Sequence, residues 1–158
     1  MMKVLIIGRF QPFHLGHLSL LREASKLGEL TIAIGSSEKK NEEKNPLSFE
    51  ERKRCLKKVL DEEGMKAKIV DVPDYGDNEL WTEELLKRVG EFDIVMTGNP
   101  LVKKLLKSRS KKVLEPTPCK KSRLNGTRIR KLMRDGGEWE KLVPEVLRDF
   151  LKKRMCSR

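Results

Sequence analysis

The sequence is poor in histidine, glutamine, cysteine and aromatic residues. It has 158 residues with two histidines, a single glutamine at Gln11 and 5% aromatic residues. The three cysteines, Cys55, Cys119 and Cys156, are widely spaced and form no CxxC pair. This spacing argues against both a disulfide framework and a zinc site, so we expect three reduced thiols with no role in the chemistry.

Long hydrophobic runs are also missing. Hydrophobic residues make up 37% of the chain and fall in short blocks, too short to span a membrane. The N-terminal sequence MMKVLIIG has one charge and an apolar block shorter than that of a signal peptide, with no cleavage site. We therefore expect a soluble cytoplasmic protein without a membrane partner. Its length favours a single domain over residues 1–158.

The net charge of +11 is concentrated in the last third of the chain. Residues 1–100 hold 16 Lys and Arg against 18 Asp and Glu (−2), whereas residues 101–158 hold 19 against 6 (+13). Few aromatic residues are interleaved with these charges, which favours attraction of polyphosphate over a nucleic-acid partner. A basic, non-catalytic nucleic-acid-binding protein remains the alternative from a different class. Retention on a polyanion that collapses with modest salt would argue against it.

Short β-rich blocks alternate with amphipathic segments along most of the chain. The pattern predicts strands at 3–7, 30–34, 68–72, 92–96 and 112–114, and helices at 15–27, 49–63, 79–89, 101–107, 127–134 and 144–154. Ser48 with Glu51 predicts a capping box at the start of the second helix, and Gly64 predicts its end. We expect an α/β fold with a doubly wound, Rossmann-like parallel sheet, helices on both faces and a small C-terminal helical region.

The loop after the first predicted strand holds both histidines of the chain. It reads GRFQPFHLGH from Gly8 to His17 and leads directly into a helix. Two imidazoles on either side of Gly16, at the N-terminus of a helix, can meet phosphate oxygens together with backbone N–H groups. A turn with two surface histidines would be the simpler interpretation, but the position between a buried strand and a helix favours phosphate binding.

This string resembles the HxGH signature of nucleotidyltransferases, and over its full length it resembles archaeal-type nicotinamide mononucleotide adenylyltransferases. Related cytidylyl and pantetheine-phosphate enzymes usually carry Asp in place of Gln11. Further segments also resemble that family: GSSE at 35–38, NELW at 78–81, GNPLV at 98–102, NGTRIRKLM at 125–133 and WEKLVP at 139–144. The resemblance implies transfer of AMP from ATP to nicotinamide mononucleotide, giving NAD and pyrophosphate. It also implies Mg²⁺ or another divalent ion carried with ATP, no metal site in the protein, and a homo-oligomer.

The resemblance implies three groups of site residues. The catalytic group is Arg9, His14, His17 and Arg130. The group that binds ATP and its phosphates is Gly8, Phe10, Gly16, Gly98, Asn99, Asn125, Gly126 and Thr127. The group that binds the nicotinamide nucleotide is Gly35, Ser36, Asn78 and Trp81.

Some of these assignments compete with structural interpretations. The Trp81 indole can stack on a cationic pyridinium, but a tryptophan within the core is an equally good interpretation. Arg130 is expected to grip the triphosphate from a helix capped near Thr127, whereas Arg128 lies on a different face. Lys44 stands where the family commonly has arginine, so its charge is kept and the planar fork is lost.

Another acceptor on the same fold is the nearest alternative to nicotinamide mononucleotide. Flavin, pantetheine and lipid headgroup phosphates are the candidates. Trp81 and the Gln11 version of the motif favour the nicotinamide nucleotide.

Overall fold

The computed structural model describes residues 1–118 and 123–156, so the expectation for Cys119 lies outside the described residues. The chain forms two compact units. Unit 1 consists of residues 1–9, 20–38 and 66–117, and unit 2 of residues 10–19, 39–65 and 118–158. The single domain expected over residues 1–158 stays a prediction. No helix in the described part of the chain is both long and apolar enough to cross a membrane.

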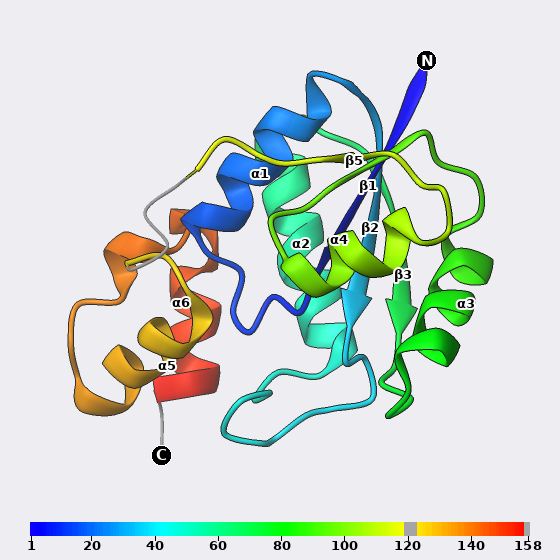
Figure 1. Cartoon of the computed structure of the whole chain (residues 1–158). Coiled ribbons are helices and arrows are strands. Elements are labelled where there is room, and N and C mark those ends of the chain that lie inside the picture. The colour runs from blue at the N-terminus through cyan, green and yellow to red at the C-terminus, as the bar shows by residue number, and fades with distance from the viewer. Residues whose placement is uncertain (119–122, 157–158) are drawn as a thin grey trace. The chain divides into compact units, whose positions relative to one another are not determined.

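Unit 1 is built on a five-stranded parallel sheet (Figure 1). The strands are β1 (Met2–Gly8), β2 (Gly28–Gly35), β3 (Ala67–Val72), β4 (Ile94–Met96) and β5 (Val113–Leu114). Their order is β3-β2-β1-β4-β5, so the direction of winding reverses between β1 and β4. Ligands of doubly wound folds bind at the carboxyl ends of the strands near such a reversal. The predicted Rossmann-like sheet is confirmed.

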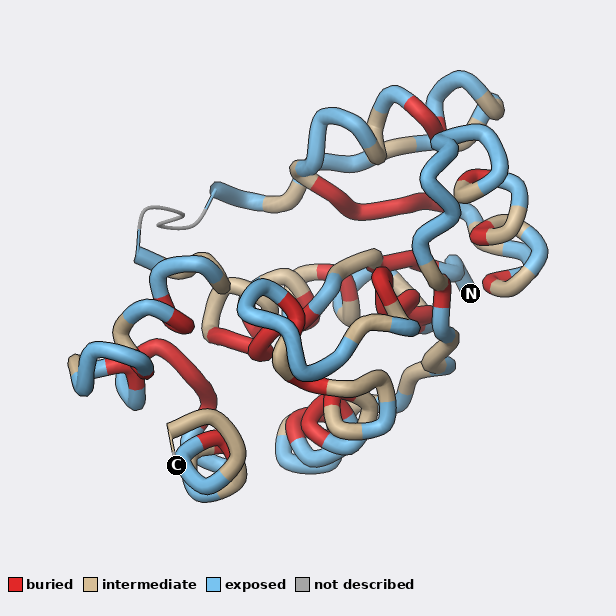
Figure 2. The backbone as a smooth tube through the Cα atoms, turned by 90° about the horizontal axis from the view of Figure 1, so that it is seen from below, coloured by how far each residue is buried: buried red, intermediate tan, exposed pale blue. Residues whose placement is uncertain are grey.

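Helices α3 (Asn78–Val89) and α4 (Pro100–Lys107) flank this sheet. Asp77 caps α3 and Asn99 caps α4, each by accepting backbone N–H groups of the first turn. One hydrophobic cluster of the core consists of Leu5, Ala33, Val72, Leu85, Val89, Val95 and Leu106. Figure 2 shows the buried residues gathered along the strands and on one side of each helix. This burial is the main stabilisation that the alternating sequence pattern provides.

Helix α1 (Leu15–Ser25) starts in unit 2 and ends in unit 1. The predicted end at residue 27 is too late, because β2 already begins at Gly28 and pairs there with Met2. Helix α2 (Phe49–Glu63) lies in unit 2 and has the predicted boundaries. Ser48 Oγ accepts the Glu51 N–H at 3.1 Å, and the Glu51 carboxylate accepts the Ser48 N–H at 2.9 Å. Gly64 ends α2 with a φ of 68°, so the capping box and the glycine stop are both confirmed.

The C-terminal helical region differs in detail from the prediction. Helix α5 (Gly126–Asp135) is capped by Asn125 rather than near Thr127, since the Asn125 side chain accepts the Arg128 N–H at 2.8 Å. One helix over 144–154 is wrong. The chain instead forms 3-10 turns at Glu140–Leu142 and Glu145–Leu147, then α6 (Arg148–Leu151) and a π-helical turn at Lys152–Cys156. The Leu147 N–H bonds to the Pro144 carbonyl three residues earlier, which is a 3-10 bond, so the segment does not begin as an α-helix.

Candidate functional site

The two histidines lie stacked within residues 10–17 of unit 2, a segment that runs into the first turn of α1 and is here called the histidine loop. Their ring centroids are 3.7 Å apart. His14 Nδ1 accepts the Gly16 N–H at 3.1 Å, and His17 Nδ1 accepts the His14 N–H at 3.1 Å. A nitrogen that accepts a hydrogen bond carries no proton, so each neutral ring holds its proton on Nε2. Both rings therefore offer an Nε2–H donor of the kind that a phosphate oxygen accepts.

Burial keeps both imidazoles neutral at physiological pH. It lowers the pKa of His14 to about 4. The pKa of His17 is lowered well below its usual value by burial first and by the neighbouring His14 second. Neutral rings can donate hydrogen bonds to an anion, but they bring no charge of their own. Positive charge at this site must therefore come from groups other than the two histidines.

The fold of the histidine loop explains two further residues of the motif. Phe10 has a φ of 54°, is almost fully buried, and packs edge-on against His17 with centroids 4.7 Å apart. A Cβ on Gly16 would lie 2.9 Å from His14 Cε1, so glycine leaves room for the His14 ring in this position. Gly16 is expected to allow close approach of phosphate, and the structure adds a steric reason for glycine at this position. A phosphate-binding role of Phe10 and Gly16 stays a prediction.

Arg130 lies in the same unit and is buried, with 7% exposure. Its Nη1 donates to the Gln11 carbonyl at 2.8 Å and its Nη2 to Thr127 Oγ1 at 3.3 Å. A Cβ on Gly126 would lie 2.8 Å from Arg130 Nη1, so glycine leaves the room that this guanidinium needs. Arg128 and Thr127 are exposed. The predicted contrast between Arg128 and Arg130 thus has a clear structural basis.

The neutral, buried state of His14 predicts a pH dependence of stability. An unfolded histidine titrates near pH 6.5, whereas folded His14 titrates at about 4, so the unfolded state binds the extra proton in between. Stability is therefore lost as pH falls through 6.5, and the loss levels off below about 4. At about pH 5 the loss from His14 alone is roughly 2 kcal/mol.

Urea unfolding of the wild type and of His14→Asn near neutral pH and near pH 5 measures this loss. The variant is expected to lose less stability on acidification than the wild type. Equal losses would mean that His14 is not held neutral by burial.

The remaining predicted residues mostly line one pocket of unit 1, with a volume of about 400 Å³. The predicted residues along its wall are Gly8, Arg9, Gly35, Ser36, Asn78, Trp81 and Asn99. They follow the carboxyl ends of β1, β2, β3 and β4, which is where a doubly wound sheet binds ligands. The pocket thus brings together the residues expected for the nicotinamide nucleotide, two expected for ATP (Gly8 and Asn99) and the expected catalytic residue Arg9.

Trp81 is neither a surface residue nor a fully buried one. It is half-buried, packs against the apolar core of unit 1 and also lines the pocket. One part of the indole therefore contributes to the core, and another is available to a ring in the pocket. The core interpretation thus holds in part, and stacking of Trp81 on a nicotinamide ring stays a prediction.

Asp74 is a pocket residue that the sequence motifs missed. Ser36 Oγ lies 3.1 and 2.9 Å from the two Asp74 carboxylate oxygens and donates to them. Ser36 is buried and has a φ of 48°, a strained conformation for a residue with a side chain. Asp74 follows the end of β3, and this position was the one signal that could have found it.

The other expectations concern Lys44, Gly98, the metal and the thiols. Lys44 is exposed on the loop before α2, and Gly98 lies between β4 and the Asn99 cap. Within residues 1–118 and 123–156, no group of three or more His, Cys, Asp or Glu side chains is placed to hold a metal ion. Cys55 and Cys156 are free thiols, and burial raises the pKa of Cys55 to about 11.

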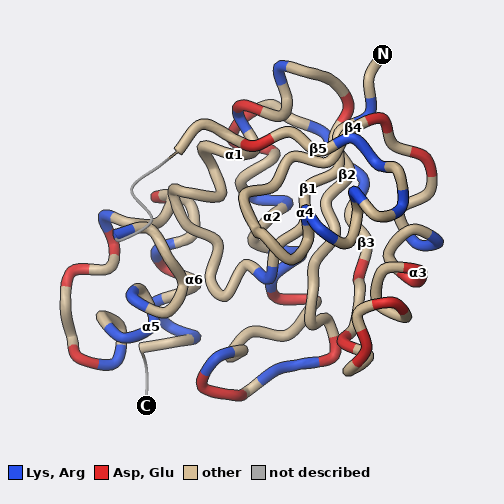
Figure 3. The backbone as a smooth tube through the Cα atoms, in the orientation of Figure 1, with Lys and Arg blue, Asp and Glu red and all other residues tan. Residues whose placement is uncertain are grey.

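Many basic side chains of the last third are paired with acidic ones. Figure 3 shows Lys and Arg interspersed with Asp and Glu beside α5 and beyond it. Ion pairs join Lys131 to Asp135, Lys141 to Glu138 and Arg154 to Glu51. Such pairing reduces the basic surface that a polyanion would meet.

The chain matches the cytidylyltransferase-like family over residues 5–125. It is 38% identical to the nicotinamide-nucleotide adenylyltransferase of Thermococcus onnurineus, over 94% of this chain and 81% of that protein. Identity to the protein of the same name from Methanolobus tindarius is 36%, over 96% of this chain and 88% of that protein.

Solved structures agree with these relatives. The bifunctional NMN adenylyltransferase/ADP ribose pyrophosphatase of Francisella tularensis, complexed with AMP and a Mn ion, has a TM-score of 0.79 and 25% identity. The match covers 98% of this chain and 50% of that protein. Sequence and fold together show that the chain belongs to the archaeal-type nicotinamide-nucleotide adenylyltransferases of the cytidylyltransferase-like family.

Proposed function

We propose that this chain transfers the adenylyl group of ATP to nicotinamide mononucleotide, forming NAD and pyrophosphate. The observation that carries the proposal is the set of donors in unit 2: two neutral imidazoles with their protons on Nε2, and the buried guanidinium of Arg130. Donors of this kind suit a polyphosphate whose negative charge shifts during the reaction. Membership of the family supports nicotinamide mononucleotide as the acceptor.

The reaction needs no general base from the protein. The acceptor phosphate is largely dianionic near neutral pH, and one of its oxygens attacks the α-phosphorus of ATP. A new P–O bond forms, the bond from the α-phosphorus to the bridging oxygen breaks, and pyrophosphate leaves with the electron pair. His14 and His17 would donate to phosphate oxygens as this charge develops, and Arg130 would supply the positive charge. Neutral histidines fit the role of donors better than the role of proton acceptors.

The unit 1 pocket supports binding of the nicotinamide ring. Trp81 would lie against the pyridinium, a cation over an indole face, with Asn78 and Ser36 nearby in the wall. A divalent ion, most simply Mg²⁺, would arrive on the phosphates of ATP as part of the substrate. Arg9 belongs to the catalytic group of this proposal. Its ATP side comprises Gly8, Phe10, Gly16, Gly98, Asn99, Asn125, Gly126 and Thr127.

The proposal also covers the domain organisation, the location and the oligomeric state of the protein. By resemblance to its family, the chain acts as one nucleotidyltransferase domain over residues 1–158, in the cytoplasm and as a homo-oligomer. Its partners are small nucleotides, with no nucleic acid and no membrane. NAD formation from ATP and nicotinamide mononucleotide, measured by reduction of the product in a coupled dehydrogenase assay, tests the proposal. No NAD in the presence of Mg²⁺, with the folded protein, would reject it.

Replacing Trp81 with alanine is expected to raise KM for nicotinamide mononucleotide about 5- to 30-fold, because stacking on a desolvated cation contributes roughly 1–2 kcal/mol. KM for ATP should stay nearly unchanged, since the ring lies away from the reacting phosphates. Trp81→Phe keeps an aromatic face and should restore most of the affinity. If Trp81→Ala unfolds while Trp81→Phe and Trp81→Leu show normal kinetics, Trp81 contributes to the core alone.

A further inference from the structure

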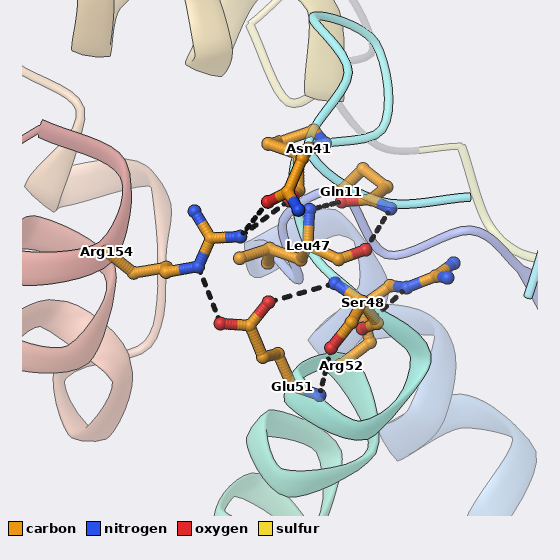
Figure 4. Close-up of polar contacts among 8 residues, drawn as sticks. Gln11, Asn41, Leu47, Ser48, Glu51, Arg52 and Arg154 are labelled. Carbon is orange, nitrogen blue, oxygen red and sulfur yellow. Dashed lines mark hydrogen bonds and ion pairs between the residues drawn. The ribbon is translucent and has the colours of Figure 1, made fainter. Parts of the chain in front are cut away.

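Gln11, the only glutamine of the chain, is buried and bound to the backbone of one residue. Its Nε2 donates to the Leu47 carbonyl at 2.8 Å, and its Oε1 accepts the Leu47 N–H at 2.9 Å (Figure 4). The Gln11 side chain is 3% exposed and Leu47 is 1% exposed. The amide therefore joins the histidine loop to the segment of residues 41–47, and Leu47 uses both of its polar groups.

Only an amide of this length can make both hydrogen bonds at neutral pH. The Leu47 carbonyl requires a donor and the Leu47 N–H requires an acceptor. A carboxylate has acceptors alone, so it would leave the buried Leu47 carbonyl facing a negative oxygen. A protonated carboxylic acid has one O–H and one C=O, and it can replace the amide in both bonds.

The main chain of Gln11 holds a second functional group. Its carbonyl accepts Arg130 Nη1 at 2.8 Å, and it lies 3.2 Å from the position that a Cβ on Gly126 would take. A shift of Gln11 would therefore move the acceptor that fixes one end of the Arg130 guanidinium. It would also move His14, which follows three residues later in the same loop.

The segment of residues 41–47 is held from its other side by Arg154. Arg154 Nη2 donates to the Pro46 carbonyl at 2.9 Å and to Asn41 Oδ1 at 2.8 Å, and Nε donates to Glu51 at 2.6 Å (Figure 4). Within the described residues, the buried Asn45 Oδ1 has no hydrogen-bond partner. Gln11 and Arg154 thus hold the segment through hydrogen bonds, and an exposed ion pair between Glu43 and Arg134 adds a further contact.

We infer that Gln11 is a positioning residue for adenylyl transfer. Its side chain fastens the histidine loop to residues 41–47, while its carbonyl orients Arg130. The inference rests on the proposed function and gives Gln11 a different task from recognition of the acceptor. The difference between glutamine here and aspartate in related enzymes then reflects how the loop is anchored.

Gln11→Glu tests this inference through its pH profile. At about pH 8 the carboxylate disrupts the anchor, and kcat is expected to fall about 10- to 100-fold, since small misplacements of catalytic groups have effects of this size. Burial beside the Leu47 carbonyl raises the pKa of such a carboxyl above its usual value of about 4.3. Towards about pH 5.5 the acid form should restore both bonds, so the ratio of variant to wild-type kcat should rise. Gln11→Ala has no such group and should show no recovery.

The matched control is Val59→Ala, a cavity variant in the same unit, because Val59 is buried and lies on α2 several helical turns after Leu47. It should lower Tm and leave kcat at the wild-type value well below Tm. Equal kcat values of Gln11→Glu, Val59→Ala and the wild type would make Gln11 merely structural. A low kcat of Gln11→Glu without recovery at low pH, or an effect confined to KM for the acceptor, would equally overturn the inference.

Trypsin cleavage after Lys44 supplies a second measurement that does not depend on activity. Lys44 is exposed in the anchored segment. At about pH 8, cleavage there should be faster in Gln11→Glu than in the wild type, and this difference should shrink at lower pH. Unchanged cleavage would contradict the anchor. If the wild type makes no NAD but Gln11→Glu is still cleaved faster than the wild type at about pH 8, the proposed function is rejected and the anchor is kept.

Discussion

Replacing His17 with alanine is expected to lower kcat about 10²- to 10³-fold, with little change in KM for ATP, as for loss of one oxyanion-type donor. His17 Nδ1 is occupied by the His14 N–H, so its Nε2–H is the ring group left to donate to a substrate oxygen. That bond should strengthen as charge develops on the phosphates, which places its loss in kcat. Steady-state kinetics with varied ATP measure the two parameters.

His17→Asn separates the donor from the fold of the loop. The asparagine oxygen can still accept the His14 N–H, but it cannot replace the Nε2–H donor. A loss of kcat as large as that of His17→Ala is therefore expected. Near-normal activity of the asparagine variant would mean that His17 only shapes the loop. A change confined to KM would assign it to binding of the ground state.

The Arg130→Lys variant is expected to lose about 10²-fold in kcat and to bind ATP more weakly. Arg130 keeps one Nη on the Gln11 carbonyl and another on Thr127 Oγ1, and a planar fork can serve a carbonyl and a phosphate at once. Lysine has one ammonium on a flexible stem, so it must leave either the carbonyl or the phosphate. Burial of the side chain makes the abandoned contact costly.

Arg128→Lys is the matched control for Arg130→Lys. Arg128 lies two positions earlier on α5, and its side chain is exposed. Its backbone N–H meets the Asn125 cap in any variant, so the kinetics of Arg128→Lys should be close to those of the wild type. Equal and small effects at both positions would mean that α5 is a solvated basic helix without a grip on the triphosphate.

Local signals in the sequence predicted the secondary structure well where the stabilising contacts are local. The Ser48–Glu51 capping box and the Gly64 stop lie within the helix that they bound, so the sequence alone predicts them. Asn125 and Thr127 are both plausible caps, and asparagine is the better one in an extended conformation. No local signal marks the change from 3-10 to α and π turns over residues 145–156.

Contacts between residues that are far apart in the chain could not be predicted from the sequence. Gln11 and Leu47 are 36 positions apart, and Arg154 and Glu51 are 103 apart. No periodicity or motif reports that such side chains meet. The role of Gln11 in anchoring a loop could therefore not be predicted, although the residue itself was noticed. Likewise, Trp81 is half-buried because it packs against the core of unit 1, and this packing could not be predicted from the sequence.

Sequence motifs name candidate site residues, but they do not give the hydrogen bonds or the protonation of those residues. The spacing of His14 and His17 indicates phosphate binding, but the proton positions and neutral state depend on backbone donors and burial that only the fold supplies. Asp74 escaped notice because it belongs to no motif and matters through Ser36.

The most direct test of the account compares acceptors. Pyrophosphate release from ATP and Mg²⁺ is measured with nicotinamide mononucleotide, flavin mononucleotide and phosphopantetheine, each over a range of concentrations, to give kcat/KM. We expect nicotinamide mononucleotide to give the highest value and NAD to accumulate in step with pyrophosphate. Faster pyrophosphate release with flavin mononucleotide or phosphopantetheine would contradict the assignment of the acceptor.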